Sequence, residues 1–67
     1  MIIKIREVIG TSEKSFEDAL NNAVHHELMH QKKITGAKVV SQSAEVKDGK
    51  ITLYKVGAKL AYIWEEA

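Results

Sequence analysis

The chain has 67 residues, enough for a single small domain spanning residues 1–67 and too few for a second one. It contains no cysteine, so neither a disulfide bond nor a thiolate metal site can stabilise a fold of this size. Ten basic and nine acidic residues give a net charge of +1, which excludes the strongly basic surface typical of nucleic-acid binding.

The first residues, MIIKIREV, carry a charge at every second or third position, which is not the pattern of a secretory signal peptide. No apolar run approaches the roughly 20 residues that a membrane-spanning helix needs. We therefore expect a cytoplasmic protein that binds neither membranes nor nucleic acid.

In residues 2–9, apolar side chains alternate imperfectly with charged ones, which predicts a β-strand. On this strand Arg6 shares a face with Val8, while Glu7 lies on the opposite face. The face with Glu7 also carries three isoleucines, Ile3, Ile5 and Ile9. A turn is predicted at 10–14, where glycine and small hydroxyl residues gather.

Helical periodicity follows over residues 15–32. Ser15 is a good N-cap, and Asp18 three residues later completes a weak capping box. Gly36 is the expected point at which the helical segment is broken. The apolar stripe predicted to face a sheet consists of Phe16, Ala19, Leu20, Ala23, Val24 and Leu28.

Two strands are predicted in the C-terminal half, at 37–46 and 51–64, joined by Asp48 and Gly49. Asp-Gly is a strong hairpin signal because a type I′ turn needs positive φ at both central residues. The strand at 51–64, the third of the chain, is much longer than an average strand and must bend. Gly57 is a natural place for the bend.

These elements predict an α+β fold with the order β-α-β-β, in which a three-stranded antiparallel sheet partly wraps around one helix. The first strand is expected beside the third, and the helix on one face. Because one helix cannot cover both partly apolar faces of so long a sheet, we expect the uncovered face to form a subunit interface.

In the order and spacing of its elements, the chain resembles the dodecin family. The resemblance is densest in EVIGTSEKSFEDAL (residues 7–20) and in AKVVSQSAEVKDGKITLYKVGAKLAY (residues 37–62), which contains the VKDGKI hairpin. It implies a hollow homododecamer with cubic symmetry. In flavin-binding members, flavins stack in pairs near the three-fold axes, and these members store and quench flavin without being enzymes.

The resemblance also points to two cofactor-binding positions, Gly36 and Lys55. Flavin-binding members typically have a tryptophan at the first position, which stacks on the isoalloxazine ring, and a glutamine at the second. Both are replaced here, so we expect FMN or riboflavin to bind weakly or not at all. The remaining tryptophan, Trp64, is interpreted either as a displaced stacking platform or as an aromatic residue packed at the end of a strand.

Residues His26 to His30 fit the pattern H-E-x-x-H, in which two histidines four apart on a helix bind zinc and the glutamate is the general base. No third ligand is apparent, since His25 projects about 100° around the helix from His26. A metallopeptidase is therefore disfavoured. Two interpretations stay open. One is incidental binding of a transition metal by His26 and His30, within one chain or across a symmetry axis, and the other is polar residues at the edge of the apolar stripe or at a subunit contact.

Glu27 falls inside the predicted apolar stripe, where an isolated carboxylate would be costly. One explanation is a pair with His30, within the helix or between subunits. The other is an ion site made by Glu27 side chains of symmetry-related subunits.

Four functions are compatible with these observations. The first is a non-enzymatic dodecin-like shell that binds or stores a small ligand, with flavin as the ligand implied by the resemblance. The alternatives are a shell that holds a metal ion or another ligand, a purely structural assembly, and a metallopeptidase.

Overall fold

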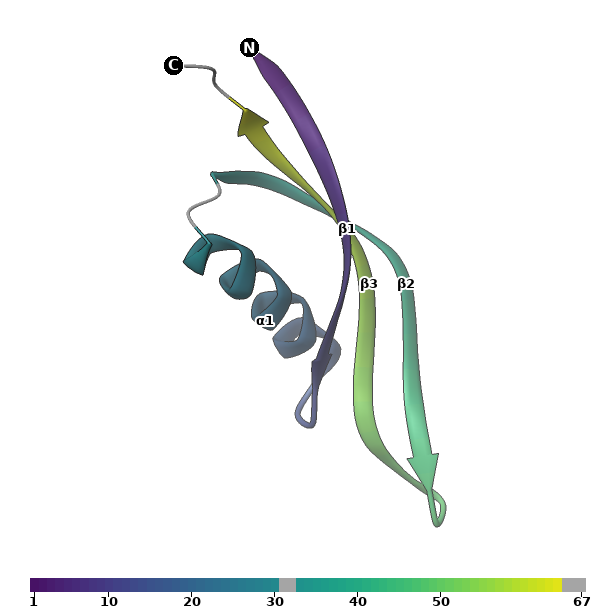
Figure 1. Ribbon diagram of the computed structural model, residues 1–67. Helices are drawn as coiled ribbons and strands as arrows, with labels where there is room; N and C mark the ends of the chain where they lie inside the picture. The colour runs from purple at the N-terminus through teal and green to yellow at the C-terminus, as the bar shows by residue number, and fades with distance from the viewer. Residues whose placement is uncertain (31–32, 65–67) are drawn as a thin grey trace.

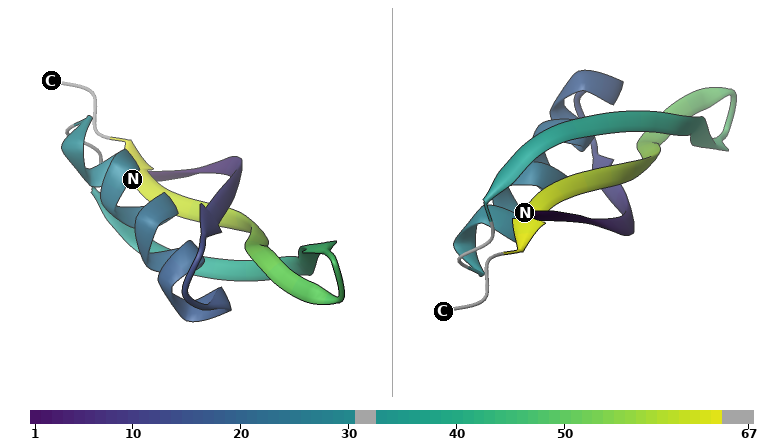
Figure 2. Two further views of the ribbon diagram at one scale, coloured as in Figure 1. Left: turned by 90° about the horizontal axis from the view of Figure 1, so that it is seen from below. Right: turned by 90° about the horizontal axis from the view of Figure 1, so that it is seen from above.

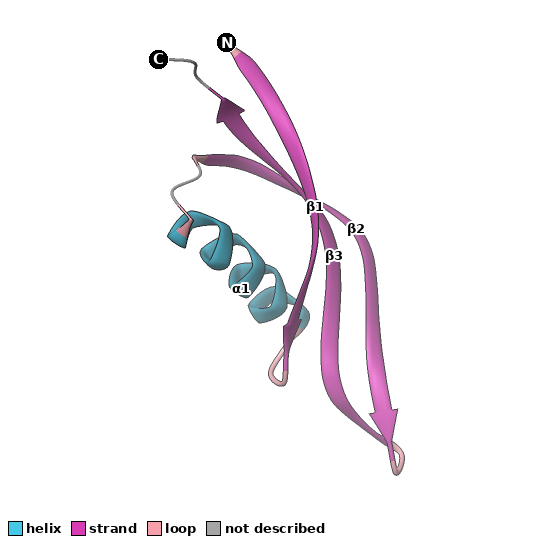
Figure 3. Ribbon diagram, in the orientation of Figure 1, coloured by secondary structure: helices cyan, strands magenta, loops and turns pink. Residues whose placement is uncertain are grey.

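The computed structural model describes residues 1–30 and 33–64. Its elements confirm the predicted β-α-β-β order (Figures 1 and 3). They are β1 (Ile2–Ser12), α1 (Phe16–Met29), β2 (Ile34–Lys47) and β3 (Lys50–Trp64).

The three strands form one antiparallel sheet with the order β1-β3-β2, so β3 is the central strand. The prediction that the first strand lies beside the third is therefore confirmed. Figure 2 shows the sheet curving around α1, which covers only one of its faces. The hairpin end of β2 and β3 extends beyond the helix (Figure 1).

The core lies where α1 crosses the middle of β3. Val56, Ala58 and Leu60 alternate along β3 toward the helix, and Ala19 meets them from α1; all four are fully buried. Partly buried apolar residues surround this cluster, namely Val8, Phe16, Leu20, Val24 and Ile34. A core this small is what a chain of this length can build alone.

The buried face of α1 is formed by Ala19, Ala23 and Glu27, which are spaced four residues apart. The predicted stripe was wrong at Leu28, which is 48% exposed because it lies about 100° around the helix from Glu27. Two alanines at the contact allow β1 to approach closely at Gly10. Within the described part of the chain, no helix is long and apolar enough to cross a membrane.

The boundaries of the elements differ from the predictions at three places. β1 continues through Ser12, because residues 10–12 remain paired with β3. Gly36 does not break the helix; it lies inside β2 and pairs with Ala61. The predicted helix end at Lys32 lies outside the described residues, and α1 ends at Met29 with His30 as its C-cap.

The predicted Ser15 N-cap and the predicted hairpin turn are both confirmed, whereas the capping box differs from the prediction, because the Ser15 amide donates to the Ser12 hydroxyl oxygen at 3.5 Å. The Ser15 hydroxyl accepts a hydrogen bond from the Asp18 amide at 2.9 Å, and Asp18 in turn accepts one from the Ser12 hydroxyl at 2.6 Å. At the hairpin, Asp48 and Gly49 have φ angles of 54° and 77°, as a type I′ turn requires.

The sheet has an irregular outer strand and an exposed apolar face. Register shifts interrupt β2 at three places, between Ile34 and Gly36, between Val39 and Ser41, and between Glu45 and Val46. The face of β1 that points away from α1 exposes its three isoleucines, Ile3, Ile5 and Ile9.

Candidate functional site

The two predicted flavin positions lie on the same face of the sheet, the one that α1 does not cover. Gly36 pairs with Ala61 on β3, and Lys55 lies six residues before Ala61 on the same strand. An even separation along a strand places side chains on one face. A Cβ atom added at Gly36 would meet only the Ala61 Cβ, at 4.0 Å, so this position is open.

Within one protomer these two positions are far apart. Six residues of β-strand span roughly 20 Å at about 3.3 Å per residue. Gly36 and Lys55 of the same chain therefore do not surround one ring-sized ligand. A site that uses both positions needs them from two copies of the chain.

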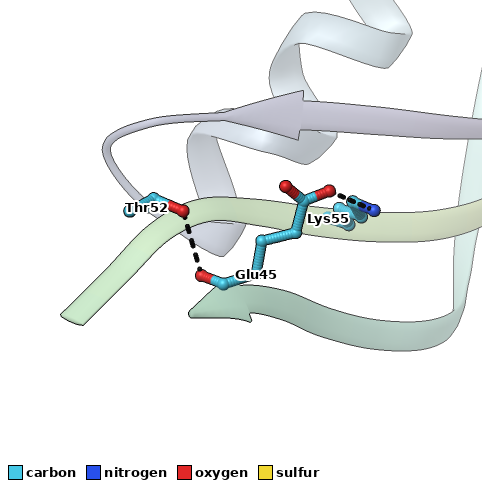
Figure 4. A network of polar contacts seen from close by, with 3 residues as sticks. All are labelled: Glu45, Thr52 and Lys55. Carbon is cyan, nitrogen blue, oxygen red and sulfur yellow. Dashed lines mark hydrogen bonds and ion pairs between the residues drawn. The ribbon is translucent and has the colours of Figure 1, made fainter. Parts of the chain in front are cut away.

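The ammonium group of Lys55 is paired within its own sheet. Its Nζ lies 2.6 Å from Oε2 of Glu45 on β2, and the backbone oxygen of Glu45 accepts a hydrogen bond from the Thr52 hydroxyl at 3.3 Å (Figure 4). Both ends of the ion pair are partly exposed, with Lys55 at 37% and Glu45 at 55%. The lysine charge at this position is therefore offset by a neighbouring carboxylate.

Trp64 lies on the opposite face of the sheet from Gly36. It is three residues from Ala61, the partner of Gly36, and an odd separation reverses the face. The Lys4 ammonium lies 4.1 Å from the centroid of its ring, a cation–π contact. A ligand stacked on Trp64 would thus lie on the opposite face of the sheet from Gly36 of the same protomer.

The other aromatic contact on this face is structural. The ring of Tyr54 meets that of Phe16 edge to face, with centroids 4.9 Å apart and an interplanar angle of 79°. This contact fixes the start of α1 against β3.

Glu27 is buried against β1 and forms an ion pair with Arg6. Its Oε1 lies 2.8 Å from the Arg6 Nε, and its side chain is only 4% exposed. The sequence indicates that Glu27 needs a partner, but it does not single out Arg6. The available signal was that Arg6 shares a strand face with Val8, the face that packs on the helix.

His26 on α1 and His30, the C-cap of that helix, lie side by side. Their ring centroids lie 4.7 Å apart with an interplanar angle of 64°, and both residues are exposed. With Arg6 and Glu27 they line a pocket of about 260 Å³. A second pocket of about 210 Å³ also reaches His26 and Glu27 and continues along the edge of β1.

This arrangement differs from a catalytic zinc site. Among the residues that the structure describes, no three His, Cys, Asp or Glu side chains form a group that could hold a metal ion. The carboxylate of Glu27, which would be the general base, is buried and paired with Arg6. The geometry thus brings together the three predicted metal-site residues but offers at most two imidazoles for coordination.

The fold and the family comparison define the class of this protein. A β-α-β-β protomer whose three-stranded sheet curves around one helix is the architecture of small α+β dodecin-like proteins. The family model described as Dodecin matches residues 2–65. The chain belongs to the dodecin family. No curated protein matches it significantly.

Solved structures agree with this assignment. Dodecin from Streptomyces coelicolor is 29% identical, with a TM-score of 0.93 over 98% of this chain and 94% of that one. The calcium-chelating immunodominant antigen calcium dodecin from Mycobacterium tuberculosis, which has a calcium-binding site, is 28% identical, with a TM-score of 0.84 over 100% and 96%. Dodecin from Streptomyces davaonensis shares the fold at 20% identity, with a TM-score of 0.91 over 97% and 96%.

Proposed function

We propose that this chain assembles into a dodecin-like homo-oligomeric shell, most simply a dodecamer, that binds or stores a small ligand and is not an enzyme. We further propose that its flavin site is altered. The observation that carries this second part is the glycine at position 36, which has no side chain of its own to stack on a ligand ring and lies in an open position.

The shape of the protomer supports assembly. Its radius of gyration is 13.7 Å and its extents are 52 × 20 × 12 Å. A compact chain of this length would have a radius of gyration of about 11 Å. An elongated protomer with exposed isoleucines on an uncovered sheet face gains apolar burial by association.

The chemistry at the two predicted positions supports weak flavin binding. Stacking of an aromatic side chain on a flat ring is worth about 1 kcal/mol beyond the area that it buries, and glycine supplies none of this. Lysine in place of a neutral amide can donate hydrogen bonds but cannot accept one. The Glu45 carboxylate beside Lys55 also reduces the attraction of this site for the phosphate of FMN.

A flavin titration tests the proposal. We expect little quenching of riboflavin or FMN fluorescence by the unmodified protein at micromolar concentration. Tight stoichiometric quenching would show that another aromatic residue has taken over the stacking role, and would contradict the proposal. Replacing Glu45 by Gln should increase the affinity for FMN more than that for riboflavin, because only FMN carries a phosphate that Lys55 can attract.

The matched gain-of-function variant is Gly36→Trp combined with Lys55→Gln. It should strengthen flavin binding if these two positions face one ligand in the assembly. Light scattering of the same samples must show an unchanged oligomer, so that a change in affinity is not a change in assembly. If the double variant binds no better, the assignment of these positions to the flavin site is wrong.

The second candidate is a shell of the same architecture that holds a metal ion or another ligand, or is purely structural. Its support is the similarity to calcium dodecin, which has a calcium-binding site. Elemental analysis after dialysis against buffer without chelator distinguishes the two. A stoichiometric metal with no bound flavin would favour this candidate. The expected cytoplasmic location stays a prediction.

A further inference from the structure

We propose that His26 and His30 form a two-point binding site for a late first-row divalent ion such as Zn²⁺, Ni²⁺ or Cu²⁺. This site is separate from the flavin positions, which lie on the opposite face of the sheet from α1. It therefore stands independently of whether the chain binds a flavin.

The separation of the two rings suits one shared ion. A metal–nitrogen bond is about 2.0–2.1 Å long, and the ring centroid lies about 1.1 Å behind the nitrogen. Two imidazoles that subtend about 90–110° at one ion would then have centroids about 4.5–5.2 Å apart. The observed 4.7 Å falls within this range, and the two rings meet at an interplanar angle of 64°.

The surroundings favour an ion that accepts few protein ligands. Both histidines are exposed and open onto the pocket of about 260 Å³, which leaves room for water in the remaining coordination positions. Imidazole nitrogen suits Zn²⁺, Ni²⁺ and Cu²⁺, whereas Ca²⁺ and Mg²⁺ prefer oxygen. The site should therefore be selective for the first group.

The ion pair of Arg6 and Glu27 lines the same pocket as the two histidines and affects the charge of the metal site. The Arg6 guanidinium and the Glu27 carboxylate line the same pocket and lie 2.8 Å apart, so together they contribute no net charge. Because Oε1 of Glu27 is paired with Arg6, we assign coordination of the metal ion to the two imidazoles alone. This gives a weaker site than one with three or four protein ligands.

The chain supplies its own matched control. His25 is exposed like His26, is its neighbour in sequence, and projects about 100° around the helix from it. Three single variants of the full chain, His25→Gln, His26→Gln and His30→Gln, should be titrated with Zn²⁺ by calorimetry after removal of metal. Circular dichroism and light scattering confirm that each retains its fold and assembly.

We expect loss of either His26 or His30 to weaken Zn²⁺ binding by about tenfold or more, because a chelate loses one of two protein ligands. His25→Gln should bind as the unmodified protein does. A large excess of Ca²⁺ should not displace Zn²⁺. Electron paramagnetic resonance of the Cu²⁺ complex should show coupling to imidazole nitrogens that is reduced in the His30 variant.

Three results would contradict the proposal that His26 and His30 bind the ion. Equal affinities in all three variants would place the ion elsewhere in the molecule. A loss with His25→Gln as large as that with His30→Gln would show that the helical spacing does not matter. Competition by Ca²⁺ would indicate a site built from oxygen ligands.

Discussion

Glu27 places a negative charge on the buried face of α1, and Arg6 compensates it from β1. Burial makes such a pair costly to form and more costly to break, because removing one partner leaves the other in a medium that solvates it poorly. The two residues differ in exposure, since the Arg6 side chain is 55% exposed and that of Glu27 only 4%. The consequences of removing them are therefore unequal.

We expect Arg6→Met to lower the free energy of unfolding by about 1–3 kcal/mol, because a buried carboxylate loses a charge-assisted hydrogen bond. Glu27→Gln should cost less, since a neutral amide is easier to bury and the half-exposed Arg6 keeps its hydration. Urea denaturation at one fixed protein concentration measures both changes.

The double variant completes the test. If the two side chains stabilise each other, the effects of Arg6→Met and Glu27→Gln should be non-additive. Glu13→Gln, at an exposed carboxylate in the turn before α1, is the control and should change the stability by less than about 0.5 kcal/mol. Additive effects would show that the pair contributes nothing to the fold.

The sequence predicted that Glu27 needs a partner but not which one. The pattern of α1 alone places the carboxylate in the stripe and suggests His30, which is the nearest basic residue on the same face. Arg6 is distant in sequence, and its approach depends on how β1 lies across the helix, which local periodicity does not define. The pairing of Lys55 with Glu45 has a different cause: both lie in the predicted hairpin, but the register shift between Glu45 and Val46 decides that they share a face.

At the scale of the elements, local signals predicted the order of the elements, the Ser15 cap and the Asp48–Gly49 turn. They fail at Gly36 and at residues 10–12, where a glycine predicts the end of an element but the strand continues. In both places pairing with β3 continues through the glycine, because cross-strand hydrogen bonds outweigh its low strand propensity.

The packing of β1 on α1 depends on Gly10. A Cβ atom there would overlap the backbone oxygen of Ala19 and lie 2.9 Å from the Ala23 Cβ, so the strand and helix would have to separate. We expect Gly10→Ala to destabilise the protein by about 1–3 kcal/mol, as overpacking does, with a lower melting temperature as the readout.

Gly36→Ala is the matched control, because a Cβ atom at Gly36 has only ordinary contact distances around it. This variant should change the stability by less than about 0.5 kcal/mol. Equal effects of the two substitutions would mean that Gly10 matters only through its backbone freedom and not through the close approach to α1.

At the scale of the whole molecule, the protomer is long and thin, with its core at one crossing of helix and sheet. Both ends of the sheet lack a covering layer (Figure 1). The sequence indicated this imbalance, because β3 has two partly apolar faces and one helix covers only one of them. It does not define how copies of the chain are arranged, since that depends on the shape of the whole surface.

If folding and assembly are coupled, stability must depend on protein concentration. We expect the melting temperature to rise when the concentration is raised tenfold, with multi-angle light scattering reporting an oligomer before the transition. A melting temperature that does not change with concentration, together with a stable monomer at micromolar concentration, would contradict the proposed assembly.

The interruptions of β2 have a consequence for the chain before it assembles. β2 is an outer strand of 14 residues, and a long regular edge of this kind invites further strands to add to it without limit. Three register shifts break its hydrogen-bonding ladder into short pieces, and each adds a local twist. An edge of this kind is a poor template for a fibril. Along the β2 edge, contact between protomers through side chains is therefore favoured over the addition of further strands.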